Sequence, residues 1–241
     1  MAPEIDKSAR WFSRYPSVVR IDEQQSVTLT DRQKIAYRWA PKTGAIADIG
    51  SSSGPLGRAL CKNGRSVVAV DLDLFSLSQV KKGPVEYAGA SASRLPFRDA
   101  SFDTVLLLDV LEHVDDERGT LAEAHRILRD GGTMILSVPN KGFFAFLDPQ
   151  NLASRFKAKG EPYHRHYSEG DLLALFGSNF RVVRKHTGGL FLYPVTFYLA
   201  HFFKKYFHLD WRRFFALIGD FDNDISWGRF SYNIIVLLEK C

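Results

Sequence analysis

The chain has 241 residues, of which 45% are hydrophobic and 24% charged, with two cysteines and a formal net charge of +5 at pH 7. This composition excludes a low-complexity chain, and the two distant cysteines exclude a disulfide framework or a cysteine zinc site. We expect a globular protein in a reducing, cytoplasmic compartment, with a weak preference for anionic partners or surfaces.

The N-terminal stretch, residues 1–41, is predicted to be a helical segment that precedes the main domain. A helix is expected from Asp31 to Ala40, with its N-cap at Thr30 or Asp31 and its end set by Pro41. The segment either closes over a binding site as a lid or packs its aromatic side chains on the domain. Its first residues lack the basic-then-apolar pattern of a signal peptide.

From residue 42 to residue 241, apolar runs alternate with helical patterns, which predicts a mostly parallel sheet with helices on both faces. The expected strands are 45–50, 66–71, 85–89, 102–109, 132–138, 181–186 and 231–239. The expected helices are 55–63, 73–82, 117–129 and 169–177. Asp73 and Ser168 are expected to cap two of these helices, and Gly131-Gly132 to end the third.

The first strand runs into a helix through Gly50-Ser51-Ser52-Ser53-Gly54. Glycine lets the backbone adopt positive φ and lets a ligand approach without meeting a Cβ atom. The second strand ends in Asp71, where a carboxylate can accept hydrogen bonds from a ribose diol. Together these features predict a site for a cofactor that contains a nucleoside.

The glycine spacing does not match that of dinucleotide-binding proteins, because Ser52 stands where G-x-G-x-x-G requires its middle glycine. The acidic Asp48 before the turn would repel a pyrophosphate. It suits a ligand that is cationic at that end, such as the sulfonium and α-amino group of S-adenosylmethionine.

Five motifs between residues 45 and 140 resemble those of class I S-adenosylmethionine-dependent methyltransferases. The likeness is to the type 11 branch, which includes the methyltransferases of ubiquinone and menaquinone biosynthesis. The motifs are Asp48-Ile49-Gly50-Ser51-Ser52-Ser53-Gly54, Val70-Asp71-Leu72-Asp73, Leu95-Pro96-Phe97-Arg98-Asp99-Ala100-Ser101-Phe102-Asp103, Asp109-Val110-Leu111-Glu112-His113-Val114 and Arg126-Ile127-Leu128-Arg129-Asp130-Gly131-Gly132.

The resemblance implies a Rossmann-like, seven-stranded α/β sheet in which the last strand is antiparallel and lies between the fifth and the sixth. Helical insertions are expected at about 141–167 and 190–230. The resemblance also implies S-adenosylmethionine as cofactor and S-adenosylhomocysteine as product.

The resemblance implies that each motif binds a different part of the cofactor. The acidic and glycine residues of the first motif and Asp109 hold its methionine end, Asp71 holds the ribose, and Leu72 contacts the adenine. This chain departs from the pattern at Ser52 and at Ser91-Ala92, where a glycine and an acidic residue are usual. The candidate cofactor-binding residues are Asp48, Gly50, Ser52, Gly54, Asp71, Leu72, Ser91, Ala92, Asp109 and Val110.

Methyl transfer to a hydroxyl or an activated carbon needs a group that removes a proton near neutral pH. His113 follows the fourth strand, beside the expected cofactor site, and is the first candidate. His164 and His166, after the fifth strand, are the second. Each could equally be a structural imidazole, and no metal site is expected, because these histidines lack further ligands at useful spacing.

Fourteen of the 32 aromatic residues fall between Phe191 and Phe230, interrupted by pairs of lysine and arginine. The uncharged part is too short for a transmembrane helix. Two amphipathic helices are expected instead, near 194–207 and 211–218. Their predicted inward stripe consists of Val195, Tyr198, Leu199, Phe202, Tyr206 and Leu209.

The sequence therefore predicts a methyltransferase that acts by O- or C-methylation on a small, hydrophobic or lipid-like acceptor. The aromatic segment 191–230 would contact a membrane surface, pack on itself, or form a homodimer interface. A peripheral position at the inner membrane surface is one expectation. The alternatives are an RNA or protein methyltransferase, although nucleic acid is the less favoured partner, and a cofactor-binding protein without catalysis.

Overall fold

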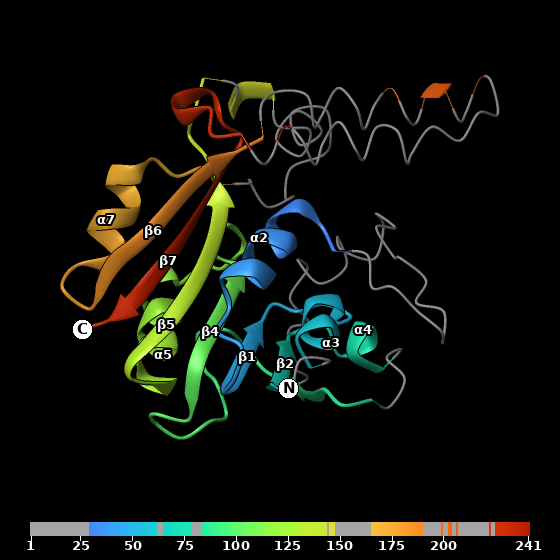
Figure 1. Cartoon of the computed structure of the whole chain (residues 1–241), viewed down its shortest axis with the longest axis vertical. Coiled ribbons are helices and arrows are strands. Elements are labelled where there is room, and N and C mark those ends of the chain that lie inside the picture. The colour runs from blue at the N-terminus through green and yellow to red at the C-terminus, as the bar shows by residue number, and fades with distance from the viewer. Residues whose placement is uncertain are drawn as a thin grey trace, which may run out of the picture.

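The computed structural model describes residues 29–61, 65–78, 83–143, 145–147, 165–189 and 225–241, together with Leu199, Phe202, Phe203, Tyr206 and Asp222. Within these residues, seven strands form one sheet (Figure 1). The strands are β1 (Ala45–Ile49), β2 (Ser66–Asp71), β3 (Glu86–Gly89), β4 (Phe102–Leu108), β5 (Leu128–Pro139), β6 (Phe180–Gly188) and β7 (Asn233–Lys240). The α-helices are α2 (Asp31–Trp39), α3 (Pro55–Cys61), α4 (Leu74–Ser78), α5 (Glu117–Ile127) and α7 (Glu169–Phe176).

The strand order is β3-β2-β1-β4-β5-β7-β6. The first five strands pair in parallel, whereas β7 runs antiparallel to both β5 and β6. The predicted topology, with the last strand inserted between the fifth and the sixth, is confirmed. Parallel pairing brings the carboxyl ends of β1, β2 and β4 to the same edge of the sheet.

Local hydrogen bonds set the helix starts at the predicted residues. Thr30 and Gln33 form a reciprocal capping box at the start of α2, and Ser168 and Asp171 form another at the start of α7. The Asp73 carboxylate accepts hydrogen bonds from the backbone N–H groups of residues 75 and 76. The capping residues have short side chains that accept hydrogen bonds from the first backbone N–H groups of a helix. Residues of this kind mark a helix start in the sequence, so these starts could be predicted.

The predicted end of helix 117–129 is wrong. Helix α5 ends at Ile127, and β5 begins at Leu128, ahead of Gly131-Gly132. Leu128 pairs with Phe102, and the register then shifts before Thr104 pairs with Thr133. Gly131 adopts a φ of +69° at this irregularity. The glycines therefore make a bulge within the strand rather than a helix cap.

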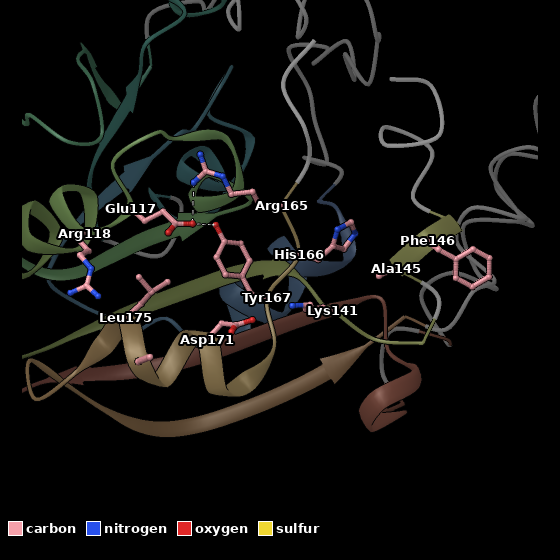
Figure 2. A pocket seen from close by; sticks show the side chains of 11 residues that line it. Glu117, Arg118, Lys141, Ala145, Phe146, Arg165, His166, Tyr167, Asp171 and Leu175 are labelled. Atoms are coloured by element: carbon pink, nitrogen blue, oxygen red, sulfur yellow. Dashed lines mark hydrogen bonds and ion pairs between the residues drawn. The ribbon is translucent and has the colours of Figure 1, made fainter. Parts of the chain in front are cut away.

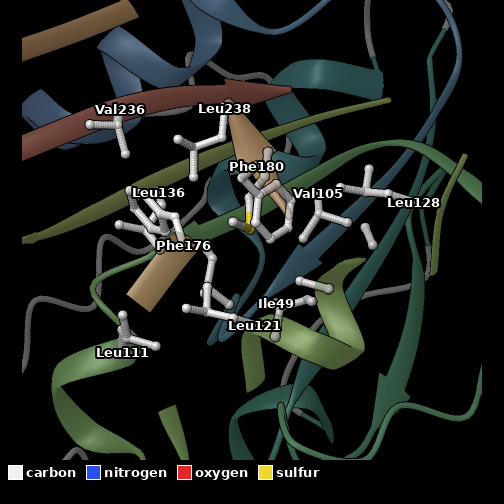
Figure 3. Close-up of a cluster of buried hydrophobic side chains, with 14 of the residues drawn as sticks. Ile49, Val105, Leu111, Leu121, Leu128, Leu136, Phe176, Phe180, Val236 and Leu238 are labelled. Carbon is white, nitrogen blue, oxygen red and sulfur yellow. The ribbon is translucent and has the colours of Figure 1, made fainter. Parts of the chain in front are cut away.

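Helices cover both faces of the sheet and enclose two hydrophobic cores. On one face, α2 and α3 bury Ile35, Ala36, Leu56 and Leu60 against the strands. On the other face, α5 and α7 pack against the strands around a larger cluster of buried hydrophobic side chains, which Figure 3 shows. Its labelled residues include Ile49, Val105, Leu121, Leu136, Phe176 and Val236. Successive side chains of a strand point to opposite faces of the sheet, so alternate strand residues belong to alternate cores.

The predicted helices 194–207 and 211–218 lie almost wholly outside the described residues, as does most of the N-terminal segment. Three residues of the predicted inward stripe are described, and all three are exposed: Leu199 at 39%, Phe202 at 48% and Tyr206 at 61%. For these three the prediction is wrong. Phe202 instead contacts Tyr206, with ring centroids 4.9 Å apart and the ring planes tilted by 43°. Within the described ranges we find no helix with the length and apolar character needed to cross a membrane.

Candidate functional site

The glycine turn between β1 and α3 is held against the end of β2 by backbone hydrogen bonds. The N–H groups of Gly50 and Ser51 donate to the carbonyl oxygen of Val70, at 2.8 and 3.0 Å. Gly50 and Gly54 have φ values of +70° and +65°, and Ser52 has +51°. The turn therefore depends on left-handed backbone at three positions, one of which is not glycine.

Close packing explains why two of these positions are glycine. A Cβ atom on Gly50 would lie 2.2 Å from Cγ2 of Val110, a separation that no real side chain tolerates. A Cβ atom on Gly54 would lie 3.0 Å from the ring of Tyr87. Gly50 thus brings the turn against the residue that follows Asp109, so two of the predicted cofactor-binding motifs touch.

Asp71 ends β2 and fixes the loop around it. Its Oδ2 accepts a hydrogen bond of 2.6 Å from the backbone N–H of Ser52, and its Oδ1 accepts one of 2.8 Å from that of Asp73. Each carboxylate oxygen can accept a second hydrogen bond. The carboxylate is therefore oriented by the backbone while it keeps the capacity to bind a ligand hydroxyl.

Asp48 lies on β1, directly before the turn, and only 4% of its surface is exposed. Burial, with the negative charge of the neighbouring Asp71, raises the pKa of its carboxyl to about 7, although a hydrogen bond from the backbone N–H of Gly57 acts in the opposite direction. A buried carboxyl of this kind gains stabilisation from a nearby cation. The site is therefore electrostatically suited to a positively charged ligand.

Asp109 follows β4 in left-handed backbone, with a φ of +56°. Its Oδ1 accepts a hydrogen bond of 2.8 Å from the hydroxyl of Ser137 on β5. Its Oδ2 lies 2.6 Å from Nε of Arg32 on α2. Arg32 also donates from Nη1 to the side-chain carbonyl of Asn233 on β7, at 2.8 Å. The start of α2 is thus tied to the carboxyl ends of β4 and β5 and to the first residue of β7.

Sequence reasoning missed Arg32, Ser137 and Asn233. One signal was present: Arg32 lies in the first turn of α2, where the helix dipole disfavours a cation. A cation in that position indicates a partner elsewhere in the fold. The sequence alone does not identify that partner, because Asp109 is 77 residues away.

The remaining predicted cofactor-binding residues lie along the same edge. Leu72, just after Asp71, has 49% of its surface exposed. Ser91 and Ala92 follow β3 and are half-buried, and the hydroxyl of Ser91 lies 3.0 Å from that of Ser93. The carbonyl oxygen of Asp71 accepts a hydrogen bond from the N–H of Ala90. This bond keeps the two segments adjacent.

The two described candidate histidines lie on different segments of the chain. His113 ends the short 3-10 helix η1 (Leu111–His113), directly after Asp109-Val110, and is half-buried. His166 lines a pocket between α5 and α7 (Figure 2). His164 lies outside the described residues. In the described part of the chain, no group of three or more His, Cys, Asp or Glu residues could hold a metal ion.

The central part of the chain is similar in sequence to known methyltransferases. Residues 47–136 match the sequence profile of a methyltransferase domain. A ubiquinone biosynthesis O-methyltransferase of Pseudomonas aeruginosa is 29% identical over 150 residues, which cover 57% of this chain and 61% of that protein. A Mycobacterium tuberculosis protein named as a probable S-adenosylmethionine-dependent methyltransferase is 29% identical over 147 residues, covering 59% and 47%. The chain thus spans about half to three-fifths of the length of these relatives.

Solved structures show the same fold. An S-adenosylmethionine-dependent methyltransferase from Thermotoga maritima superposes with a TM-score of 0.62 and 19% identity, covering 88% of each chain. The 1,6-didemethyltoxoflavin-N1-methyltransferase of Burkholderia thailandensis, solved with S-adenosylhomocysteine bound, gives a TM-score of 0.54 and 16% identity, covering 87% of this chain and 76% of that one.

Proposed function

We propose that residues 47–136, which match the profile of a methyltransferase domain, bind S-adenosylmethionine, and that the chain methylates a small, hydrophobic or lipid-like acceptor at oxygen or carbon. The observation that carries the proposal is the edge of the sheet at which Asp48, Asp71 and Asp109 meet the glycine turn. The ends of β1, β2 and β4 bring these carboxylates together.

The residues at this edge fit S-adenosylmethionine. When bound, the cofactor supplies an electrophilic methyl group on a sulfonium. Asp48, buried and with its pKa raised to about 7, gains a counter-charge from such a cation. Asp71 is oriented to accept hydrogen bonds from the ribose, and the exposed Leu72 offers apolar surface to the adenine.

Arg32 and Asp109 present a cation and an anion side by side, 2.6 Å apart. The methionine end of the cofactor carries one carboxylate and one ammonium, so the two side chains match its two charges. We therefore include Arg32 among the cofactor-binding residues. Helix α2, which carries it, would then order the edge of the site.

The proton of the acceptor needs a base, and His113, His166 and His164 remain the candidates. His113 stands closest along the chain to Asp109, and His166 lines the pocket beside α7. Because imidazole titrates near neutral pH, the pH–rate profile of each alanine variant assigns the role. Loss of the acidic limb in one variant alone identifies the base, whereas three unchanged profiles exclude all three.

We infer an apolar acceptor from a group of exposed aromatic side chains, which we call the aromatic rim. It consists of Phe143, Phe146, Trp227 and Phe230. All four are exposed, at 64%, 58%, 37% and 37%. The rings of Phe143 and Phe230 are 5.9 Å apart, and the guanidinium of Arg229 lies 5.0 Å from the ring of Phe230. Exposed aromatics beside cations are typical of surfaces that meet lipid headgroups.

Flotation with phosphatidylglycerol-containing vesicles tests membrane contact at the aromatic rim. We expect the wild type to float and the Phe143→Ser/Phe146→Ser variant to float less. A matched control is Leu74→Ser/Phe75→Ser, which removes two exposed apolar side chains from α4. Equal flotation of the two variants would remove the rim from the proposal.

Titration calorimetry tests the cofactor assignment. We expect S-adenosylmethionine and S-adenosylhomocysteine to bind the wild type and Asp71→Ala to weaken both by at least about tenfold, since a charge-assisted hydrogen bond is lost. The matched control is Asp130→Ala, at a fully exposed aspartate far from the edge. Binding of NAD without a response to either sulfur nucleoside would overturn the assignment.

A further inference from the structure

Two buried polar side chains lie on the face of the sheet that packs against α2. Ser137 on β5 is 0% exposed, and Asn233, the first residue of β7, is 7% exposed. Their neighbours two residues along each strand, Ile135 and Ile235, point to the same face and belong to the core beneath α2 and α3. Helix α2 lies on this face beside β4 and β5 (Figure 1). Buried polar groups need hydrogen-bond partners, so the partners of Ser137 and Asn233 indicate their role.

Ser137 holds Asp109 at two points. Its hydroxyl donates to Oδ1 of Asp109 at 2.8 Å, and its carbonyl oxygen accepts a hydrogen bond from the N–H of Asp109 at 3.0 Å. Asp109 has a left-handed backbone, with a φ of +56°. A residue other than glycine keeps such a conformation where its surroundings impose it. Ser137 therefore helps to fix both the backbone and the carboxylate of Asp109.

Asn233 holds Arg32 in a comparable way. Its side-chain carbonyl oxygen accepts a hydrogen bond of 2.8 Å from Nη1 of Arg32, across 201 positions of the sequence. Nε of the same guanidinium lies 2.6 Å from Oδ2 of Asp109. Arg32 and Asp109 thus form an ion pair in which each charge has its own anchor, on a different strand. Ser137 anchors the anion, and Asn233 anchors the cation.

The ion pair is accessible to a ligand, whereas its two anchors are not. The side chains of Arg32 and Asp109 are 26% and 30% exposed. Ser137 and Asn233, in contrast, are buried. A ligand at the edge of the sheet can therefore contact Arg32 and Asp109, and the anchors influence its binding only through these two side chains.

The anchors matter most when a ligand separates the ion pair. The bond from Ser137 uses Oδ1 and the bond to Asn233 uses Nη1, whereas Oδ2 and Nε face each other. A ligand that inserts between Oδ2 and Nε leaves both anchoring bonds intact. A side chain without an anchor would lose rotamer freedom when the ligand binds, and that loss weakens a complex. Each anchor has already removed this freedom before the ligand arrives.

We propose that Ser137 and Asn233 are positioning residues, which hold Asp109 and Arg32 ready for an α-amino acid zwitterion. The ammonium of that group binds Asp109, and its carboxylate binds Arg32. The inference rests on the proposed function, because the zwitterion is the amino-acid end of the cofactor. It adds that two buried side chains set the affinity for this end, and that each of them acts on one charge only.

Titration calorimetry with four ligands tests each anchor separately. The ligands are S-adenosylhomocysteine, its decarboxylated analogue, its deaminated analogue, and methylthioadenosine, which lacks both charged groups. We expect Asn233→Leu to weaken S-adenosylhomocysteine binding by about tenfold and to leave binding of the decarboxylated analogue unchanged, because Arg32 loses its anchor. Ser137→Ala should also weaken S-adenosylhomocysteine binding by about tenfold, but should leave binding of the deaminated analogue unchanged. Neither variant should change the affinity for methylthioadenosine.

Thr104→Val is the matched control. The hydroxyl of Thr104, which is 1% exposed, lies 3.2 Å from that of Thr133, towards the opposite end of the β4–β5 pairing from Ser137. This variant should leave all four affinities unchanged, even where thermal unfolding shows a loss of stability. Asn233→Ser is a second variant at its position, since it removes the contact with Arg32 without adding apolar volume. It should give the same pattern as Asn233→Leu.

A uniform loss of affinity for all four ligands in Ser137→Ala and Asn233→Leu would show a purely structural role and overturn the proposal. Unchanged affinity for S-adenosylhomocysteine in both variants would overturn it as well. If the wild type binds S-adenosylhomocysteine no more tightly than methylthioadenosine, the amino-acid end contacts neither charge, and the inference fails while the cofactor site stands. Failure of the wild type to bind any of the four ligands would instead overturn the proposed function, and the role of the two anchors with it.

Discussion

The edge formed by β1, β2 and β4 and the pocket between α5 and α7 are built by different means. At the edge, backbone N–H groups and left-handed residues fix the positions of carboxylates that lie within a few residues of each other or on adjacent strands. In the pocket, side chains from distant segments pair with one another, as Arg165, Glu117 and Tyr167 do. The cofactor edge is therefore constrained by backbone conformation, and the pocket by tertiary side-chain contacts.

This difference predicts that an atom added to the closely packed turn is severe, whereas the loss of one hydroxyl from the pocket is mild. Backbone conformation at the turn leaves no room to adjust, whereas paired side chains can rearrange. Changes at both places test the contrast, from the largest expected effect to the smallest.

Gly50→Ala should weaken S-adenosylhomocysteine binding by at least about 100-fold, because the new Cβ would lie 2.2 Å from Val110 in a left-handed backbone. Gly131→Ala is the matched control, since its φ of +69° is close to the +70° of Gly50 but nothing lies within 4 Å of a Cβ atom placed there. That variant should lose about 1 kcal/mol of stability and keep its affinity. Calorimetry and thermal unfolding measure both effects, and equal affinity losses in the two variants would refute the packing argument.

The pKa of Asp48 makes both stability and cofactor affinity depend on pH. The folded-state pKa of Asp48, about 7, lies above the usual aspartate value of 3.8, so the folded state retains a proton that the unfolded state has lost. Stability should therefore fall as the pH rises from about 4 to about 7, by up to about 4 kcal/mol, and then level off. Asp48→Asn should remove this slope in unfolding experiments.

Cofactor affinity should follow pH in the opposite direction. A cationic ligand binds best to the ionised carboxylate, so S-adenosylmethionine should bind more tightly as the pH rises from 6 to 8, by roughly tenfold. Asp48→Asn should bind it weakly at both pH values. An unchanged affinity of the wild type across this range would contradict the role of Asp48 as a counter-charge.

Tyr167→Phe should lower stability by about 1–2 kcal/mol, because the hydroxyl contacts both Glu117 and the carbonyl oxygen of Leu111. Its affinity for S-adenosylhomocysteine should not change. Tyr87→Phe is the matched comparison, since the buried hydroxyl of Tyr87 has no hydrogen-bond partner among the described residues and its removal should cost nothing. Urea unfolding of the two variants compares them directly, and a larger loss in Tyr87→Phe would contradict the hydrogen-bond assignment.

Ser52→Gly should have the smallest effect. It removes a left-handed serine from the turn, which favours the folded state by about 1 kcal/mol, less the entropy that glycine gains when unfolded. We expect a rise in melting temperature of a few degrees at most, with cofactor affinity retained. A clear loss of affinity would show that the hydroxyl of Ser52 itself contacts the ligand.

The same contrast explains what the sequence could predict. The strand order, the caps at Thr30 and Ser168, and the positions of Asp48, Asp71 and Asp109 follow from local patterns or from the family motifs. The start of β5 was missed because a left-handed Gly131 is compatible with both a helix end and a bulge. Only pairing with β4 decides between them.

The contacts of Arg32 and of the pocket were not predictable, because they join segments far apart in the sequence. Arg32 meets Asp109 and Asn233, and Tyr167 meets Leu111 and Glu117. No local pattern encodes such a pairing. The sequence offered only the unfavourable placement of a cation in the first turn of α2.

The central claim is that the carboxylates at the ends of β1, β2 and β4 form one cofactor site, and a crystal structure with S-adenosylhomocysteine tests it most directly. We predict ribose hydroxyls on Asp71, the amino-acid end between Arg32 and Asp109, and the glycine turn unchanged. Ligand density away from Asp71 and Asp109, or none under saturating conditions, would contradict the account.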